Sequence, residues 1–204
     1  MKSHPILFKA EMVRAILEDR KSQTRRLQGL DFMNQRPLDF SFLKMEEVKG
    51  ELVAAFWDAP KGGTVWVKSP KGKIGDRLWV QETFCDVPLP WVDENGWAKY
   101  IYRATDGKKP QMLKWKPSIF MPRKASRLTL ELTAVRVERL NDISEADAIA
   151  EGVADTFDAR IASNFVGGKP GPAQMEYWAL WESINGKGSW AQNPWVWIYE
   201  FKKP

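Results

Sequence analysis

The stretch Asp19-Arg20-Lys21-Ser22-Gln23-Thr24-Arg25-Arg26 sets an amine beside a hydroxyl inside a dense group of positive charges. Positive neighbours and burial both lower the pKa of a lysine, so Lys21 is a candidate for a neutral amine. A neutral amine can take the proton from Thr24 as that oxygen attacks a carbonyl carbon. The stretch therefore predicts a nucleophilic site that needs neither histidine nor metal, although basic clusters are more often solvated faces or phosphate contacts.

The residues around this stretch predict how it is placed. Asp19 follows a run with helical spacing and stands where a helix commonly ends in glycine, and aspartate tolerates a left-handed backbone. Residues 21–26 should then leave the helix as a turn that enters a strand. Because residues three apart face opposite sides of an ideal strand, Lys21 and Thr24 can meet only if this segment is bent.

The remaining sequence predicts an α+β fold with several short strands and few helices. In the longest strand pattern, residues 127–140, the apolar alternation slips by one residue near Thr133 and Ala134, which indicates a bulge. Ser144 is a candidate N-cap for a helix that ends at Gly152. The expected strands are 5–8, 77–84, 98–103, 127–140 and 195–201, and the expected helices are 10–18, 42–48, 144–152 and 175–184.

The length of 204 residues predicts one domain, 1–204, large enough for a sizeable core. Stretches punctuated by proline and glycine interrupt the regular patterns. We interpret them as insertions near residues 28–70, 85–120 and 155–172.

Composition limits the class of protein. Lys and Arg number 31 against 26 Asp and Glu, an excess of five that favours a nucleotide or polyanion without demanding one. No apolar run approaches the roughly 20 residues that cross a bilayer, and the N-terminus has no signal-peptide core. Cys85 is the single cysteine, which excludes an internal disulfide and fits a reducing compartment. We expect a cytoplasmic monomer that does not bind membranes.

Metal and cofactor chemistry find little support in the residue types. His4 is the single histidine and lies near the N-terminus, so the sequence favours neither histidine-based catalysis nor a zinc site. A magnesium site built from carboxylates stays open. We expect neither a metal nor a cofactor.

Glu151 falls in the last turn of the expected helix 144–152. A carboxylate there faces the negative end of the helix dipole, which costs a few tenths to about 1 kcal/mol. A compensating role is therefore suspected, the alternative being an exposed surface glutamate. Elsewhere, Trp79, beside Glu82, is a candidate surface for stacking a base.

These elements resemble the ASCH domain, a small barrel of the PUA-like superfamily with the signature Gly-x-Lys-x-x-Thr-x-Arg. Lys21, Thr24 and Arg26 match this signature, while Asp19 replaces its glycine. The 75–78 turn (Gly-Asp-Arg-Leu) and the strand end at 200–202 are similar too. Residues 115–123, 136–152 and 185–197 resemble phage-related ASCH proteins more closely, with departures at Phe120 and Lys124. The resemblance implies a PUA-like small β-barrel with flanking helices.

A bacterial enzyme of this family hydrolyses the amide of N4-acetylcytidine with a lysine, a threonine and a glutamate. Its lysine and threonine fall on Lys21 and Thr24, and the helix register places its glutamate at Glu151, with Glu145 or Asp147 as alternatives. The resemblance thus implies an amidohydrolase acting on N4-acylated cytidine, with Thr24 as nucleophile and Lys21 as base. Glu151 would be the acid that protonates the departing amine, or would orient Lys21. The residues expected to bind the substrate are Arg26, Trp79, Glu82 and Arg123.

Two other functions remain open at this point. PUA-like barrels often bind RNA without changing it, and ribonuclease activity occurs in some ASCH proteins. RNA is therefore the alternative partner to a free nucleoside.

Overall fold

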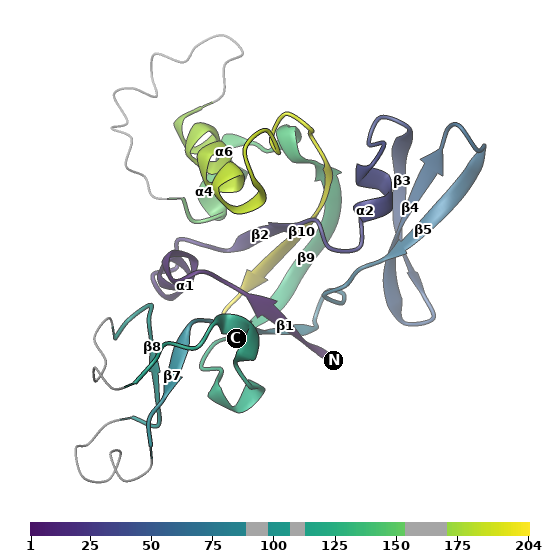
Figure 1. Cartoon of the computed structure of the whole chain (residues 1–204). Helices are drawn as coiled ribbons and strands as arrows, with labels where there is room; N and C mark the ends of the chain where they lie inside the picture. The colour runs from purple at the N-terminus through teal and green to yellow at the C-terminus, as the bar shows by residue number, and fades with distance from the viewer. Residues whose placement is uncertain (89–97, 107–112, 154–170) are drawn as a thin grey trace.

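A mixed five-stranded sheet forms the centre of the computed structural model, which describes residues 1–88, 98–106, 113–153 and 171–204 (Figure 1). The strand order is β1-β6-β9-β10-β2. β1 runs parallel to β6, and the other neighbouring strands are antiparallel. The strands are β1 (Ser3–Leu7), β2 (Gln23–Arg26), β6 (Arg77–Gln81), β9 (Thr129–Arg139) and β10 (Trp195–Lys202).

The predicted bulge in the long strand is confirmed. Opposite β10, the pairing of β9 passes from Ala134 against Glu200 to Leu132 against Phe201, which leaves Thr133 as the extra residue. The bulge returns Leu130 and Leu132 to the same face as the buried residues that follow it. This face packs into the main hydrophobic core, together with Trp197 and Tyr199 of β10.

The first helix, α1 (Ala10–Leu17), buries Val13, Ala15 and Ile16. Just beyond it, Asp19 has a φ of 58°, so the prediction of a left-handed residue here is confirmed. The turn that Asp19 forms carries the chain from α1 into β2.

Helices α4 (Glu145–Ala150) and α6 (Pro172–Asn185) cover the other face of the sheet (Figure 1). They enclose a second core in which Tyr177 and Trp181 of α6 pack with Val196 and Ile198 of β10. The Ser144 hydroxyl accepts a hydrogen bond from the Asp147 N–H at 3.0 Å, which confirms the predicted N-cap.

A separate three-stranded sheet follows the short helix α2 (Asp31–Asn34). It consists of β3 (Phe40–Val48), β4 (Glu51–Asp58) and β5 (Gly63–Lys68), in that order. The predicted helix at 42–48 is therefore wrong, because these residues pair with β4. The hairpin turns at Lys49 and Gly50, which have φ values of 50° and 80°.

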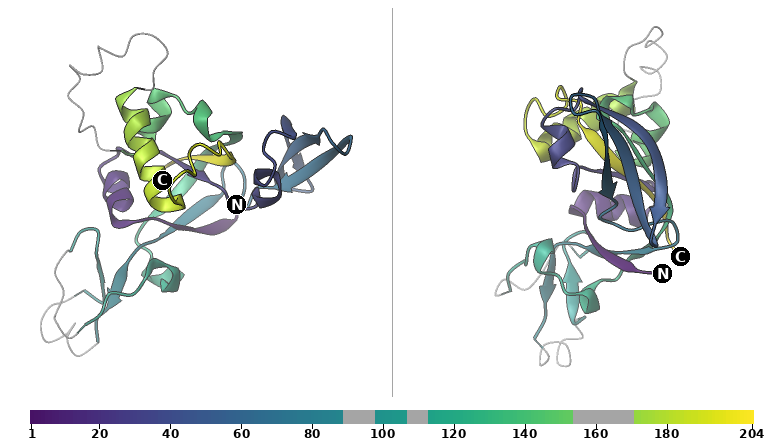
Figure 2. Two further views of the ribbon diagram at one scale, coloured as in Figure 1. Left: turned by 45° about the horizontal axis from the view of Figure 1, so that its top comes forward. Right: turned by 90° about the vertical axis from the view of Figure 1, so that its right-hand side faces the viewer.

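A small two-stranded sheet, β7 (Phe84–Asp86) and β8 (Tyr100–Tyr102), projects from the opposite end of the molecule (Figure 2). Strand 77–84 of the sequence prediction is thus divided between β6 and β7. Three short 3-10 helices complete the described structure: η1 (Ser118–Phe120), η2 (Arg123–Ala125) and η3 (Leu140–Asp142). Cys85 lies in β7 and is buried.

The predicted α+β class is confirmed by this arrangement of sheets and flanking helices. β1 and β2 are the edge strands of the main sheet, and the Arg26 side chain reaches from one to the other by donating to the Leu7 carbonyl at 2.8 Å. The expected insertion near 155–172 lies almost wholly outside the described residues. Within the described ranges, no helix has the length and apolar character to span a membrane.

Candidate active site

Lys21 lies where the turn after α1 meets the end of α4. Its N–H donates to the Ala15 carbonyl at 3.1 Å, and Lys21 forms an isolated antiparallel bridge with Glu151. The next residue, Ser22, donates its N–H to the Ala150 carbonyl at 2.9 Å. The turn therefore brings together Lys21 and Glu151, which are 130 residues apart in the sequence.

The Lys21 ammonium is buried and has three acceptors. Nζ lies 2.7 Å from the Gln23 carbonyl oxygen, 2.7 Å from the Glu151 carbonyl oxygen and 2.8 Å from Glu151 Oε2. Both side chains are almost inaccessible, at 2% and 3% exposed. Since an ammonium carries three N–H donors, this geometry satisfies each of them.

Burial lowers the pKa of Lys21, because a desolvated ammonium loses its hydration. The Glu151 carboxylate opposes this shift by charge and by its hydrogen bond, while Arg26 and Arg25 add to it. Nζ also lies 5.6 Å from the centre of the Phe8 ring. The surroundings therefore move Lys21 in the direction that a general base requires.

Glu151 is delivered by the C-terminal end of α4, where it is the C-cap residue. Gly152 follows with a φ of 78°, and a Cβ built on it would lie 2.6 Å from Lys21 Cβ and 3.0 Å from Ala15 Cβ. Glycine is thus required at 152 both by its backbone and by the close approach of the Lys21 stem. Glu151 is a buried residue, which rules out the alternative of an exposed surface glutamate.

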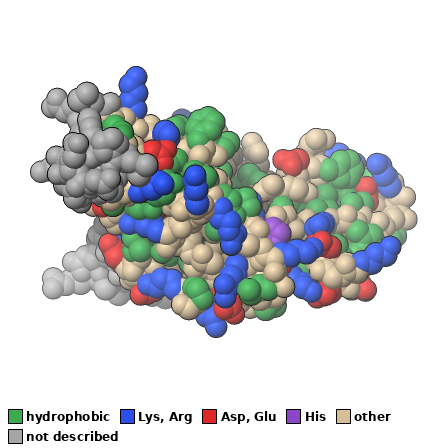
Figure 3. Space-filling model, turned by 90° about the horizontal axis from the view of Figure 1, so that it is seen from below, with side chains coloured by type: hydrophobic (Ala, Val, Ile, Leu, Met, Phe, Trp, Pro, Cys, Tyr) green, Lys and Arg blue, Asp and Glu red, His purple; other side chains and the backbone are tan. Residues whose placement is uncertain are grey.

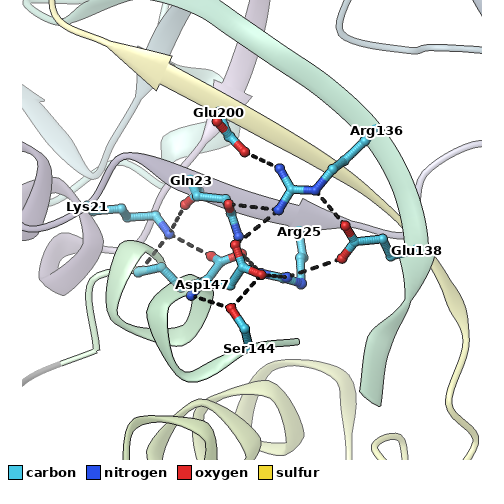
Figure 4. Close-up of polar contacts among 9 residues, drawn as sticks. Lys21, Gln23, Arg25, Arg136, Glu138, Ser144, Asp147 and Glu200 are labelled. Carbon is cyan, nitrogen blue, oxygen red and sulfur yellow. Dashed lines mark hydrogen bonds and ion pairs between the residues drawn. The ribbon is translucent and has the colours of Figure 1, made fainter. Parts of the chain in front are cut away.

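Arg25 is the member of this site that the sequence did not reveal. Its side chain is fully buried, and Nη1 donates to Glu151 Oε1 at 3.1 Å. Its Nη2 lies 3.6 Å from Asp147 Oδ2 and 3.7 Å from Glu138 Oε2. Figure 4 shows these side chains converging between β2 and α4, with Arg136 beside them. Strand alternation correctly places Arg25 on the face opposite to Thr24. The carboxylate that Arg25 binds there belongs to Glu151, at the end of α4, and alternation along β2 does not predict that partner.

Thr24 and Arg26 lie on the other face of β2. In the pairing with β10, Thr24 is opposite Tyr199 and Arg26 is opposite Trp197, and both partners belong to the main core. The Arg26 guanidinium lies 5.1 Å from the Phe8 ring centre. Among the described residues, the hydrogen bonds of Lys21 Nζ do not include one to Thr24, although Gln23, whose carbonyl it binds, is the preceding residue.

The other residues expected to bind substrate lie apart from Lys21. Trp79 is half-buried on β6, where it alternates with the core residues Leu78 and Val80 and so faces away from them. Arg123 donates to the Ser3 hydroxyl at the start of β1. These side chains are not brought to the Lys21–Glu151 pair.

Glu82 forms a second buried ion pair. Its two carboxylate oxygens accept from Arg127 Nε at 2.8 Å and Nη2 at 3.0 Å. The Arg127 guanidinium stacks 4.0 Å from the centre of the Tyr102 ring. Both oxygens of Glu82 are thus already engaged by one guanidinium.

Open space reaches Lys21 from the side of the C-terminal strand. A pocket of about 260 Å³ is lined by residues of α1, the turn after it, β9, the C-terminal end of β10 and the residue that follows β10. These residues are Ile16, Asp19, Lys21, Ser22, Leu130, Phe201, Lys202 and Lys203. Within the part of the chain that the structure describes, no group of three or more His, Cys, Asp or Glu side chains is placed to hold a metal ion.

Comparison with known proteins gives a distant structural likeness. No protein-family model and no curated protein matches this sequence. The chain is similar to the crystal structure of an ASCH domain from Lactobacillus crispatus JV V101, with 13% sequence identity and a TM-score of 0.37, over 99% of this chain and 79% of that one.

Proposed function

We propose that this protein hydrolyses the N4-acyl amide of an acylated cytosine nucleoside. The observation that carries the proposal is the buried Lys21–Glu151 pair, joined at 2.8 Å at the entrance to the strand that carries Thr24. A buried lysine is costly unless it is paired, and burial lowers the pKa of Lys21 in the direction that a proton acceptor requires. The resemblance of Lys21, Thr24 and Arg26 to the ASCH signature supplies the substrate class.

Lys21 must become neutral and turn one lone pair toward Thr24. A neutral amine has two N–H donors, so one of its three present acceptors has to release it. The Gln23 carbonyl is the acceptor nearest in sequence to Thr24, and a change at that bond would move Nζ along the chain toward the hydroxyl. Phe8, which lies close to both Lys21 and Arg26, forms an apolar wall beside this path.

In the proposed reaction, Thr24 Oγ1 bonds to the acyl carbon and its proton passes to Lys21 Nζ. The bond from the acyl carbon to N4 then breaks, and the departing amine takes a proton from the Lys21 ammonium. Glu151 orients Lys21 throughout, since both of its carboxylate oxygens are held by cations. Water then cleaves the acyl-threonine ester, which releases the carboxylic acid and restores the Thr24 hydroxyl.

Arg26 is the proposed contact to the substrate's polar groups, because Arg26 and Lys21 both lie over Phe8. Trp79, Glu82 and Arg123 are further from this pair in the fold, and a role for them would need a substrate that extends across the sheet.

The test is the conversion of N4-acetylcytidine to cytidine, followed by chromatography. Thr24→Val keeps the shape of the side chain and removes the hydroxyl, so kcat/KM should fall about 10³-fold or more. Thr24→Ser keeps the hydroxyl and should retain much of the rate. Thr133→Val, at the exposed bulge of β9, is the matched control for a threonine outside the site.

Wild-type turnover in Thr24→Val would eliminate threonine as the nucleophile. Degradation of unmodified RNA, lost in Lys21→Met, would instead favour a ribonuclease. Folding of every variant is checked by circular dichroism and thermal unfolding.

A further inference from the structure

The outer face of the β3–β5 sheet carries two exposed tryptophans side by side. Trp57 of β4 is paired with Thr64, and Ala55, two residues earlier, is paired with Trp66 of β5. Because paired and alternate residues share a face, Trp57 and Trp66 are diagonal neighbours, with backbones about 7–8 Å apart. The right-hand view of Figure 2 has this sheet nearest the viewer. We call this surface the tryptophan face; its central residues are Lys44, Ala55, Trp57, Thr64, Trp66 and Lys68.

Both indoles are open to solvent in the described structure. Trp57 is 41% exposed and Trp66 is 48% exposed, although Ala55 between them is fully buried. A small residue flanked by two large flat ones gives a level surface on which a planar group can lie. Two adjacent exposed tryptophans on one sheet face mark a binding surface more often than isolated apolar residues do.

Basic side chains flank the two rings. Lys44 is paired across the hairpin with Ala55, and its ammonium lies 5.7 Å from the centre of the Trp66 ring. Lys68 follows Trp66 by two residues on the same face. Lys44 and Lys68 are 60% and 59% exposed and are paired with Glu46 at 2.6 Å and Glu51 at 3.2 Å. Exposed pairs of this kind contribute little, so phosphate groups can replace the carboxylates.

The combination of flat rings and mobile cations matches one class of ligand. We propose that the tryptophan face binds single-stranded nucleic acid, with bases stacked on Trp57 and Trp66 and phosphates paired with Lys44 and Lys68. Aromatic rings stack on any base, and sheets with exposed aromatics are an established platform for single-stranded RNA. The excess of five positive charges over the whole chain favours the same partner.

The surroundings of this face agree with a binding role. Figure 3 shows Lys and Arg side chains gathered over the middle of the molecule, and hydrophobic side chains mixed with charged ones at the end formed by β3–β5. The inner face of the sheet is closed by Phe56 and Ala54, which belong to the main core. The outer face is therefore available while the sheet stays anchored to the rest of the fold.

The experiment measures binding of a fluorescently labelled 12-nucleotide oligouridylate to the full chain by fluorescence anisotropy. Trp57→Ala and Trp66→Ala should each weaken binding about tenfold or more. Trp178→Ala is the matched control, because Trp178 is 42% exposed on α6 and lies on a different surface. Contact with two phosphates predicts that affinity falls roughly 2.5-fold for each doubling of salt concentration.

Equal affinity of wild type and the Trp57→Ala/Trp66→Ala double variant would overturn the proposal. So would binding that does not respond to salt, or that is competed by a neutral oligosaccharide, since these would indicate a carbohydrate surface. The inference does not depend on hydrolysis at Lys21. Thr24→Val should bind the oligonucleotide as wild type does, so loss of chemistry and loss of binding are separable.

Discussion

Two buried glutamates, Glu82 and Glu151, are neutralised in different ways. Glu82 is 1% exposed, and a single guanidinium, Arg127, holds both of its oxygens. Glu151 is 3% exposed, and its oxygens are divided between Lys21 and Arg25. Arg127 is itself partly exposed, whereas Lys21 and Arg25 are both buried.

The difference separates a structural pair from one that can change its protonation. A guanidinium keeps its charge, so the Arg127–Glu82 pair has no cation that can serve as a base. At Glu151, the fixed charge of Arg25 can hold the carboxylate while Lys21, whose pKa is lowered by burial, gains and loses its proton. In the proposed function, the Lys21 ammonium is the replaceable cation of this pair, because Arg25 can hold Glu151 in its place.

The largest effect should come from Arg127→Met. This change leaves Glu82 buried without either of its hydrogen bonds, and breaking a buried pair costs about 3–5 kcal/mol. Urea unfolding at pH 7 measures the loss. A loss below about 1 kcal/mol at pH 7 would mean that another group compensates Glu82.

Gly152→Ala should be the next most damaging change, because it disturbs the placement of the Lys21–Glu151 pair without altering a charge. The positive φ and the overlap with Lys21 Cβ together predict a loss of about 2–4 kcal/mol in the free energy of unfolding and a matching loss of the proposed hydrolysis. Gly62→Ala is the control. Gly62 has a φ of 65° but open space around it, so only the backbone strain of about 1–2 kcal/mol applies. Equal losses of unfolding free energy in the two variants would show that the overlap with Lys21 Cβ does not destabilise Gly152→Ala.

Lys21→Met should destabilise the fold less than Arg127→Met does. Glu151 keeps Arg25, and the cost of burying the lysine ammonium disappears. The remaining loss, about 1–3 kcal/mol, comes from the three acceptors that lose a donor, which are the Gln23 carbonyl, the Glu151 carbonyl and Glu151 Oε2. Urea unfolding of the two variants side by side decides the order. If Lys21→Met lowers the free energy of unfolding more than Arg127→Met does, Arg25 does not compensate Glu151 for the loss of Lys21.

The pH dependence of the Lys21→Met cost is a separate test. The pKa of Lys21 is lower in the folded chain than its ordinary value of 10.5. At any pH between the folded pKa and 10.5, the unfolded chain therefore binds more protons than the folded chain does. The stability of wild type relative to Lys21→Met should therefore rise with pH in that window, by at most about 1.4 kcal/mol per pH unit. Buried Tyr177 and Tyr199 have raised pKa values, but they are present in both proteins and cancel in the difference. A flat difference between pH 8 and 10 would contradict the lowered pKa.

The sequence predicted the local structure correctly where that structure depends on residues that are adjacent in the chain. The left-handed Asp19, the bulge at Thr133 and the Ser144 cap each depend on a few adjacent residues. The helix expected at 42–48 was wrong because the partner strand β4 is what makes β3 a strand. Lys49 is unusual at a left-handed turn position, so the hairpin gave no clear signal in the sequence.

The candidate site shows the same limit. The Lys21 motif and the helix register pointed to Lys21 and Glu151, and the structure brings these two together. Arg25 was missed because its role depends on the pairing of β2 with β10, which turns Arg25 toward α4 and Thr24 toward the main core. The spacing of residues predicts which side chains share a face of a strand. It does not predict which helix or strand packs on that face.

The smallest effect should come from Asp19→Gly, which changes the turn that delivers Lys21 but leaves both glutamate pairs intact. Glycine adopts a φ of 58° without the strain that a side chain adds. The variant loses an ion pair of 2.7 Å with the partly exposed Lys203, which contributes at most about 1 kcal/mol. The net change should be a gain of about 0.5 kcal/mol in the free energy of unfolding. The proposed hydrolysis should be unaffected. If stability falls by more than 1 kcal/mol instead, the Asp19 carboxylate and Lys203 hold the turn in place, and the position of Lys21 depends on charges outside the Glu151 pair.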